Sequence, residues 1–275
     1  MRLGGPVFQA QDPESWVKAH IKAGYTACYF PLGAEASRDE INAYVDAARK
    51  EDLLIAEVGA WSNTISPDDT VRSEAVSRCQ ALLDVADRAG AQCCVNIAGS
   101  RGEQWDGPHQ DNFSQDTFDL TVDTVREIID AVRPQRTYYT LETMPWAFPD
   151  SADSYLELIR AIDRERFAVH FDPVNLVNCP RRYYDTGELI RDAFEKLGPY
   201  IRSCHAKDIA LSGRLTVHLD EVPVGQGGLD YAAYLTELGK LENEVPLMLE
   251  HMSEEEYPAA ASHIREVAGS IGVSL

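Results

Sequence analysis

The sequence predicts an α/β fold, a single (β/α)8 TIM barrel that occupies residues 1–275 as one domain. Eight apolar, strand-like runs alternate with eight amphipathic, helix-like stretches, and no linker separates them. Dividing 275 residues by eight gives about 34 per repeat, a usual length for a βα unit. The strand-like runs are apolar almost throughout, which is typical of parallel strands covered on both faces. This regularity favours a barrel over a doubly wound sheet.

The eight predicted strands are bounded by turn residues or by helix-like sequence. They are Leu3–Phe8, Tyr25–Phe30, Leu53–Val58, Cys93–Ala98, Thr137–Glu142, Phe167–Asp172, Ile201–Ala206 and Val245–Glu250.

A helix is predicted after each strand, near residues 13–23, 38–51, 70–89, 114–133, 153–164, 186–197, 229–241 and 257–271. Four of these helices begin beside a residue suited to N-capping, namely Asp12, Ser114, Ser151 and Asp185. Gly24, Gly90 and Gly198 lie where helices are expected to end.

Two connections are longer than usual, Gly99–Phe113 after the fourth strand and Leu211–Gly228 after the seventh. We predict both to be loops. In a barrel, the loops that follow the strands carry binding and catalysis.

Composition excludes several classes of function. The formal net charge of −20 leaves no basic stripe for nucleic acid. No run approaches the roughly 18 apolar residues that a membrane span requires, and the first residues lack the apolar segment of a secretory signal. The six cysteines form no CxxC pair, so we expect reduced thiols and a cytoplasmic protein.

Four polar residues stand at the ends of four successive predicted strands: Glu142, Asp172, His205 and Glu250. Their separations of 30, 33 and 45 residues are close to one repeat, with the last lengthened by the second long connection. Adjacent strand ends place them on one quarter of the barrel mouth. Three carboxylates and one imidazole form an oxygen-rich site that suits a hard divalent ion. We expect one such ion, Mn²⁺ first, with Mg²⁺ and Co²⁺ as alternatives.

The ordered motifs LET, HFDPVN, CHAKD, VGQGGLDY and LEH resemble those of the xylose isomerase-like barrel superfamily. This superfamily contains sugar isomerases, epimerases and a branch of apurinic endonucleases. The resemblance implies that Glu142, Asp172, His205 and Glu250 bind one divalent metal. It also implies that Glu142 and Glu250 are paired acid/base residues acting on a bound keto sugar through an enediolate.

One position departs from the family pattern. Asn175 stands three residues after Asp172, where many epimerases and the endonucleases have histidine. The endonuclease chemistry depends on a histidine-rich zinc cluster, so this difference and the negative charge argue against a nuclease. Asn175 remains a candidate substrate contact.

Other side chains are candidates for substrate binding. Lys207 lies two residues after His205, so its side chain is expected to point to the same side of the strand. His170 lies two residues before Asp172, and we favour a supporting role beside the metal ligand, with a buried core histidine or a direct substrate contact as the alternatives. The first long loop supplies Arg101, Trp105 and His109, and Trp146 follows Glu142 as an aromatic wall for a sugar.

Three functional readings remain open. The first is a metal-dependent isomerase or epimerase of a keto sugar. The second is a metal-dependent β-eliminating lyase or dehydratase acting on a keto sugar or 3-oxo-glycoside, like inosose dehydratases or C-glycoside-cleaving catalytic subunits. The third is a non-catalytic sugar-binding barrel. For each we expect a small-molecule sugar partner and a homo-oligomer, with a hetero-oligomer as the alternative.

Overall fold

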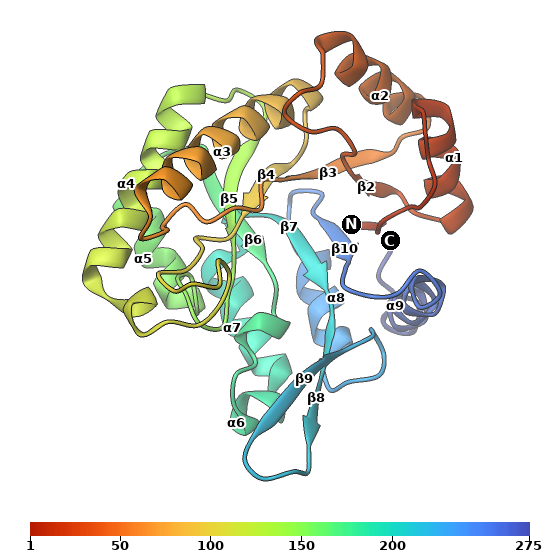
Figure 1. The fold of residues 1–275 in the computed structure, drawn as a ribbon. Helices are drawn as coiled ribbons and strands as arrows, with labels where there is room; N and C mark the ends of the chain where they lie inside the picture. The colour runs from red at the N-terminus through yellow and green to blue at the C-terminus, as the bar shows by residue number, and fades with distance from the viewer.

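Eight parallel strands close into a barrel in the computed structural model, which describes all 275 residues (Figure 1). The strand order around the barrel is β1-β10-β7-β6-β5-β4-β3-β2. The strands are β1 (Arg2–Gly4), β2 (Ala27–Tyr29), β3 (Leu54–Gly59), β4 (Cys93–Asn96), β5 (Tyr138–Glu142), β6 (Phe167–Phe171), β7 (Ile201–Ala206) and β10 (Pro246–Leu249). The predicted (β/α)8 barrel is confirmed.

The first two strands are shorter than predicted, with three residues each. Gly5 and Pro6 follow β1, and proline has no N–H for a further ladder hydrogen bond. In β2, the pairing with β3 shifts register between Cys28 and Tyr29. Apolar runs in the sequence therefore mark where these strands lie but overestimate their paired length.

Helices surround the barrel and largely match the predicted ranges (Figure 1). They are α1 (Pro13–Ala23), α2 (Arg38–Lys50), α3 (Asp69–Ala89), α4 (Gln115–Val132), α5 (Ala152–Ile162), α7 (Thr186–Leu197), α8 (Tyr231–Gly239) and α9 (Tyr257–Ile271). Short helical turns add η1 (Gln110–Phe113), η2 (Val174–Leu176), α6 (Pro180–Tyr183) and η3 (Gly198–Tyr200). None of the helices is both long and apolar enough to cross a membrane.

Most of the predicted caps are present. The side chains of Asp12, Ser114 and Ser151 accept hydrogen bonds from the first turns of α1, α4 and α5. Asp185 occupies the predicted N-cap position of α7, but its side chain makes no capping hydrogen bond. Gly24 and Gly90 end their helices with φ of 71° and 70°. Gly198 has φ −43° instead, because the chain continues there into η3.

The second long connection is mostly an antiparallel hairpin, so its prediction as a loop is wrong. Strands β8 (Asp208–Ser212) and β9 (His218–Val222) pair along their whole length. Figure 1 shows the hairpin projecting away from the barrel at the side where α6 lies. The first long connection contains only η1 as regular structure, in line with its prediction as a loop.

Asp208 joins the base of this hairpin to the glycine turn before α8. Its buried carboxylate accepts four backbone N–H hydrogen bonds of 2.9–3.0 Å, from Ile209, Gly225, Gly227 and Leu229. A Cβ atom at Gly227 would collide with this carboxylate. The glycine is therefore needed for close approach of the backbone to Asp208.

We expect Asp208→Asn to lower the free energy of unfolding by about 2–4 kcal/mol, because an amide nitrogen would replace one acceptor oxygen and leave buried N–H groups unpaired. Urea unfolding monitored by circular dichroism measures the loss. Asp220→Asn is the control, since the Asp220 carboxylate on the hairpin is 60 % exposed. Equal stability of Asp208→Asn and the parent protein would contradict the assignment.

Candidate active site

Four polar side chains meet at the carboxyl-terminal mouth of the barrel, as the spacing in the sequence predicts. Glu142 ends β5, Asp172 directly follows β6, His205 lies near the end of β7, and Glu250 directly follows β10. Each offers a ligand atom, and these atoms all lie within 4.8 Å of one another. The Glu250 side chain is 17 % exposed, and the other three are buried.

Lys207 lies in the middle of this cluster. Its Nζ atom is 2.8 Å from Asp172 Oδ2, 2.7 Å from Glu250 Oε2 and 3.3 Å from Glu142 Oε1. Lys207 is buried and lines the same cavity as Glu142 and Glu250. One ammonium group thus lies within ion-pair distance of three carboxylates and offsets part of their charge.

Burial and neighbouring charges set the pKa values in the cluster. Burial favours the neutral acid at Glu142, but Lys207 and His205 outweigh it and hold the pKa of Glu142 well below its usual value. Burial likewise opposes ionisation of Glu250, yet His205 lowers the pKa of Glu250 to about 2. Burial raises the pKa of Asp172 to about 6. Burial disfavours the imidazolium, but the surrounding carboxylates raise the pKa of His205 well above its usual value.

The cluster fits a divalent cation. Asp172 Oδ2 and Glu250 Oε2 are buried acceptors without a hydrogen bond of good geometry, although Lys207 Nζ lies within 2.8 Å of both. Such oxygens are costly to leave unsatisfied, and a cation would use their lone pairs. The donor set of three carboxylates and one imidazole suits Mn²⁺, Mg²⁺ or Co²⁺.

Asn175 lies in η2 and contacts one of the paired glutamates. Its Nδ2 atom donates a hydrogen bond of 3.1 Å to Glu142 Oε1, and its side chain lines the cavity. The residue that departs from the family pattern therefore supplies a donor that favours the ionised form of Glu142.

A cavity of about 360 Å³ opens above the cluster and is walled by aromatic rings. Three of the four tryptophans line it, and Trp61, Trp105 and Trp146 are 37 %, 40 % and 36 % exposed. Its ionisable lining consists of Asp106, Glu142, Glu221, Glu250, Lys207 and His251, without any arginine. Exposed aromatic faces beside polar groups are typical of a ligand site.

Three predicted substrate contacts lie away from this cavity. Arg101 donates a hydrogen bond of 2.7 Å to the Ile65 carbonyl. His109 caps η1 by accepting a hydrogen bond from the Asp111 backbone at 3.2 Å. His170 is fully buried and does not line the cavity, and its Nε2 lies 2.9 Å from Glu57 Oε1. As the structure places them, these side chains do not line the cavity that Trp105 and Trp146 enclose.

Sequence reasoning missed Glu57, Glu221 and His251. Glu57 is buried within β3 and contacts His205. The signal was present, since Glu57 is a single charged residue inside the apolar run LIAEVG. Glu221 belongs to the unpredicted hairpin, and His251 links it to the site, with Nδ1 3.2 Å from Glu221 Oε1 and Nε2 3.4 Å from Glu250 Oε1.

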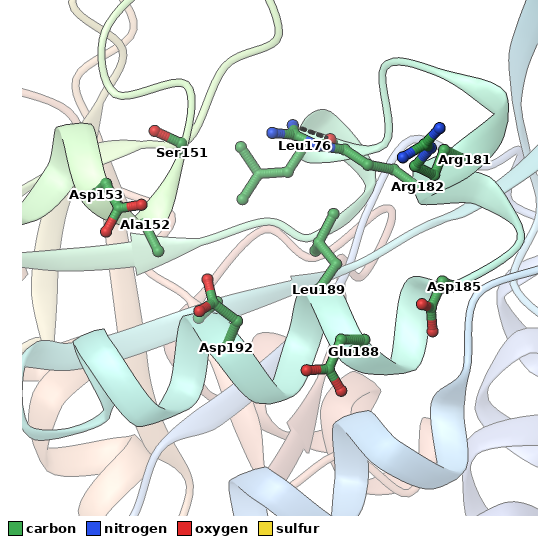
Figure 2. Close-up of a pocket in the computed structure, with 11 residues that line it drawn as sticks. Ser151, Ala152, Asp153, Leu176, Arg181, Arg182, Asp185, Glu188, Leu189 and Asp192 are labelled. Carbon is green, nitrogen blue, oxygen red and sulfur yellow. Dashed lines mark hydrogen bonds between the residues drawn. The ribbon is translucent and has the colours of Figure 1, made fainter.

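A separate cavity of about 340 Å³ lies between α5, α6 and α7, and Figure 2 shows the residues that line it. Glu188 and Asp192 lie along α7, and Asp185 directly precedes it. Arg182 donates a hydrogen bond of 2.9 Å to the Leu176 carbonyl. Its lining includes no member of the four-residue cluster and no buried polar side chain. The buried polar and ionisable side chains that could bind a metal are therefore found at the barrel mouth and not in this second cavity.

Comparison with known proteins agrees with this arrangement. The family model described as xylose isomerase-like TIM barrel matches residues 17–267. A 3-dehydroshikimate dehydratase from Bacillus anthracis is 25 % identical over 142 residues, which cover 52 % of this chain. That segment spans only 46 % of the relative's own length.

Two solved structures share the fold. A D-tagatose 3-epimerase-like protein aligns with a TM-score of 0.75 and 17 % identity, covering 99 % of this chain and 98 % of the other. The probable 3-DHS dehydratase AsbF from Bacillus anthracis aligns with a TM-score of 0.71 and 17 % identity, covering 97 % and 98 %. At such low identity these likenesses show the fold alone.

We expect Lys207→Met to lower the free energy of unfolding of the chelator-treated protein by about 3–5 kcal/mol at pH 7.5, since removing the cation leaves buried carboxylates uncompensated. The depressed pKa values of Glu142 and Glu250 contribute stability above their unfolded values near 4.5, and this contribution is lost as pH falls toward the folded values. The deficit of the variant should therefore shrink at pH 4.

Urea unfolding at both pH values measures this effect. Lys196→Met is the matched control, because the Lys196 ammonium bridges Asp153 and Asp192 at the surface and its loss should cost less than about 1 kcal/mol. A deficit of equal size at pH 7.5 and pH 4 would argue against charge compensation as the role of Lys207.

Proposed function

Because the chain belongs to the xylose isomerase-like TIM-barrel family, we propose that it is a divalent-metal-dependent isomerase or epimerase of a neutral keto sugar. The observation that carries the proposal is the pair of glutamates, Glu142 and Glu250, at the floor of a tryptophan-lined cavity. They come from β5 and β10, which are separated in the barrel by β6 and β7. The two carboxylates therefore approach from either side of Asp172 and His205.

Glu142, Asp172, His205 and Glu250 would hold the metal. When bound, a divalent ion polarises the substrate carbonyl and the neighbouring hydroxyl and stabilises the negative charge of the enediolate. One glutamate takes the proton from the carbon beside the carbonyl. In an epimerase, the other returns a proton to the opposite face of that carbon. In an isomerase, the former carbonyl carbon is protonated instead, and the proton of the neighbouring hydroxyl moves to the former carbonyl oxygen.

Lys207 and Asn175 support this proton transfer. The Lys207 ammonium lies 2.7 Å from Glu250 and 3.3 Å from Glu142, so it can donate to a substrate oxygen placed between them. Asn175 donates to Glu142 and keeps it ready to accept a proton. The three tryptophans would stack on the sugar and exclude water from the reactive intermediate.

The charges in the cavity support a neutral substrate. Four carboxylates line it against Lys207 and His251, and no arginine is present to bind a phosphate or a carboxylate group. A sugar without an anionic group fits these surroundings better than a sugar phosphate. The same reasoning disfavours the carboxylate substrate implied by the name of the dehydratase relative.

A second candidate is a metal-dependent lyase or dehydratase. The observation that favours it is the sequence similarity to a 3-dehydroshikimate dehydratase. Elimination begins with the same removal of a proton beside a carbonyl, and differs because the intermediate then expels a β-substituent. The paired glutamates serve either outcome, while a non-catalytic sugar-binding barrel would not require them.

Replacing Glu142 or Glu250 with Gln removes the base and keeps the side-chain size, so we expect kcat to fall by about 10²–10⁴-fold. The reaction is run in D₂O with Mn²⁺ and a panel of ketohexoses, inososes and 3-oxo-glycosides. Isomerase or epimerase activity places deuterium beside the carbonyl without releasing a fragment. An unsaturated ketone with released water or aglycone would instead identify the lyase, and sugar binding without any proton exchange would leave the binding-module alternative.

Trp105→Ala should raise KM by about tenfold with a smaller change in kcat, because the ring is expected to bind the sugar away from the carbons that exchange protons. His109→Ala is the matched control from the same loop, since His109 does not line the cavity and should leave KM unchanged. Steady-state kinetics on the identified substrate measures both. A larger KM effect at His109 than at Trp105 would mean that the loop closes differently around the sugar.

A further inference from the structure

Glu57 extends into the barrel interior from the middle of β3. In the closed strand order, β3 and β7 are four positions apart in either direction, so Glu57 faces the strand that carries His205. The residue is 1 % exposed, and no lysine or arginine contacts it. A buried carboxylate in such surroundings requires hydrogen-bond donors.

Three side chains meet the Glu57 carboxylate. Ser203 Oγ donates to Oε1, and His170 Nε2 lies 2.9 Å from the same oxygen. His205 Nε2 lies 3.3 Å from Oε2. Because an ionised carboxylate only accepts, both imidazoles must carry hydrogen on Nε2 in order to bond to it.

The other nitrogen of His205 faces the proposed metal ligands. Nδ1 lies 3.2 Å from Glu142 Oε1 and 2.9 Å from Glu250 Oε2. The His170 ring packs edge-on against His205, with ring centres 4.1 Å apart and planes at 74°. Without a metal, Glu142 and Glu250 make Nδ1 a donor as well, and a cation bound to these carboxylates would replace that proton. Glu57 then keeps the remaining hydrogen on Nε2, and through His170 it also holds the ring that packs against His205.

We propose that Glu57 is a positioning residue that keeps hydrogen on Nε2 of His205 and directs the Nδ1 lone pair at the divalent cation. The inference rests on the proposed metal site and adds a residue that the four ligands do not include. An apolar side chain of similar volume would fill this interior position without the cost of burying a charge. Hydrogen-bonded partners of this kind orient metal-binding imidazoles, and their loss typically weakens metal binding by about 10–100-fold.

The test is Mn²⁺ affinity, measured by electron paramagnetic resonance of the free ion, in the parent protein and in Glu57→Gln. We expect affinity to fall by about 10–100-fold, because the amide of Gln presents a donor toward imidazole N–H groups. Glu237→Gln is the control for loss of one negative charge, since that side chain is only 15 % exposed but lies on α8 and lines no part of the cavity. It should bind Mn²⁺ like the parent.

A spectroscopic measurement separates positioning from general destabilisation. In Mg²⁺-loaded protein labelled with ¹⁵N histidine, long-range ¹H–¹⁵N correlations should show the His205 hydrogen on Nε2. In Glu57→Gln we expect this signature to be lost or shared between the nitrogens. Thermal melting of the metal-free proteins reports whether the variant is folded.

The outcomes distinguish the inference from the proposed function. If the parent binds no Mn²⁺, the metal site and the role of Glu57 both fail. If the parent binds and Glu57→Gln binds within twofold of it, the role of Glu57 alone is overturned. Should Glu57→Gln fail to fold, Glu57→Asp replaces it, because it keeps the charge but withdraws the carboxylate from His205; parent-like affinity in that variant likewise overturns the proposal.

Discussion

The arrangement of this protein depends on compensating a concentration of buried negative charge. Four carboxylates, those of Glu57, Glu142, Asp172 and Glu250, converge near one end of the barrel, where each unpaired charge would be costly. Lys207 and His205 lie between them and hold the pKa values of the two paired glutamates low. The pKa of Asp172 remains raised, so the compensation is incomplete. The three carboxylates and the imidazole at this end also form a donor set that fits a divalent cation.

Closure of the sheet into a barrel explains how these carboxylates come together. In a barrel, strand ends that are about one repeat apart in sequence are neighbours in space. Glu142, Asp172 and His205 therefore lie close together, because β5, β6 and β7 are adjacent strands. The same closure brings residues from opposite strands into contact through the interior, as with Glu57 and His205. The site is thus assembled from rigid strands, while the aromatic walls come from the connections that follow them.

This distinction explains what the sequence could predict. The repeat length and the apolar runs predict the barrel, and a polar residue at each strand end predicts the four-residue cluster. Arg101 and His109 were expected at the cavity because they belong to the long loop after the fourth strand and their side chains suit a sugar. Neither the loop length nor the residue type says which way a loop side chain points. Glu57 was overlooked because its partner lies across the barrel, a contact that local pattern does not encode. The hairpin was overlooked because its strands, DIALS and HLDEV, are short, largely exposed or half-buried, and lack the apolar runs that mark the barrel strands.

Because the hairpin forms part of the cavity wall but lies outside the barrel sheet, the two can change separately in evolution. It supplies Glu221 to the cavity wall, and His251 bridges this glutamate to Glu250. Yet β8 and β9 pair only with each other, outside the barrel sheet, and Asp208 anchors them at their base. Changes in hairpin length or sequence can therefore remodel this wall of the cavity while the strands that position Glu142 and Glu250 stay intact. The shape and charge of the cavity can thus diverge through an accessory ribbon, while the barrel that positions the buried cluster is inherited unchanged.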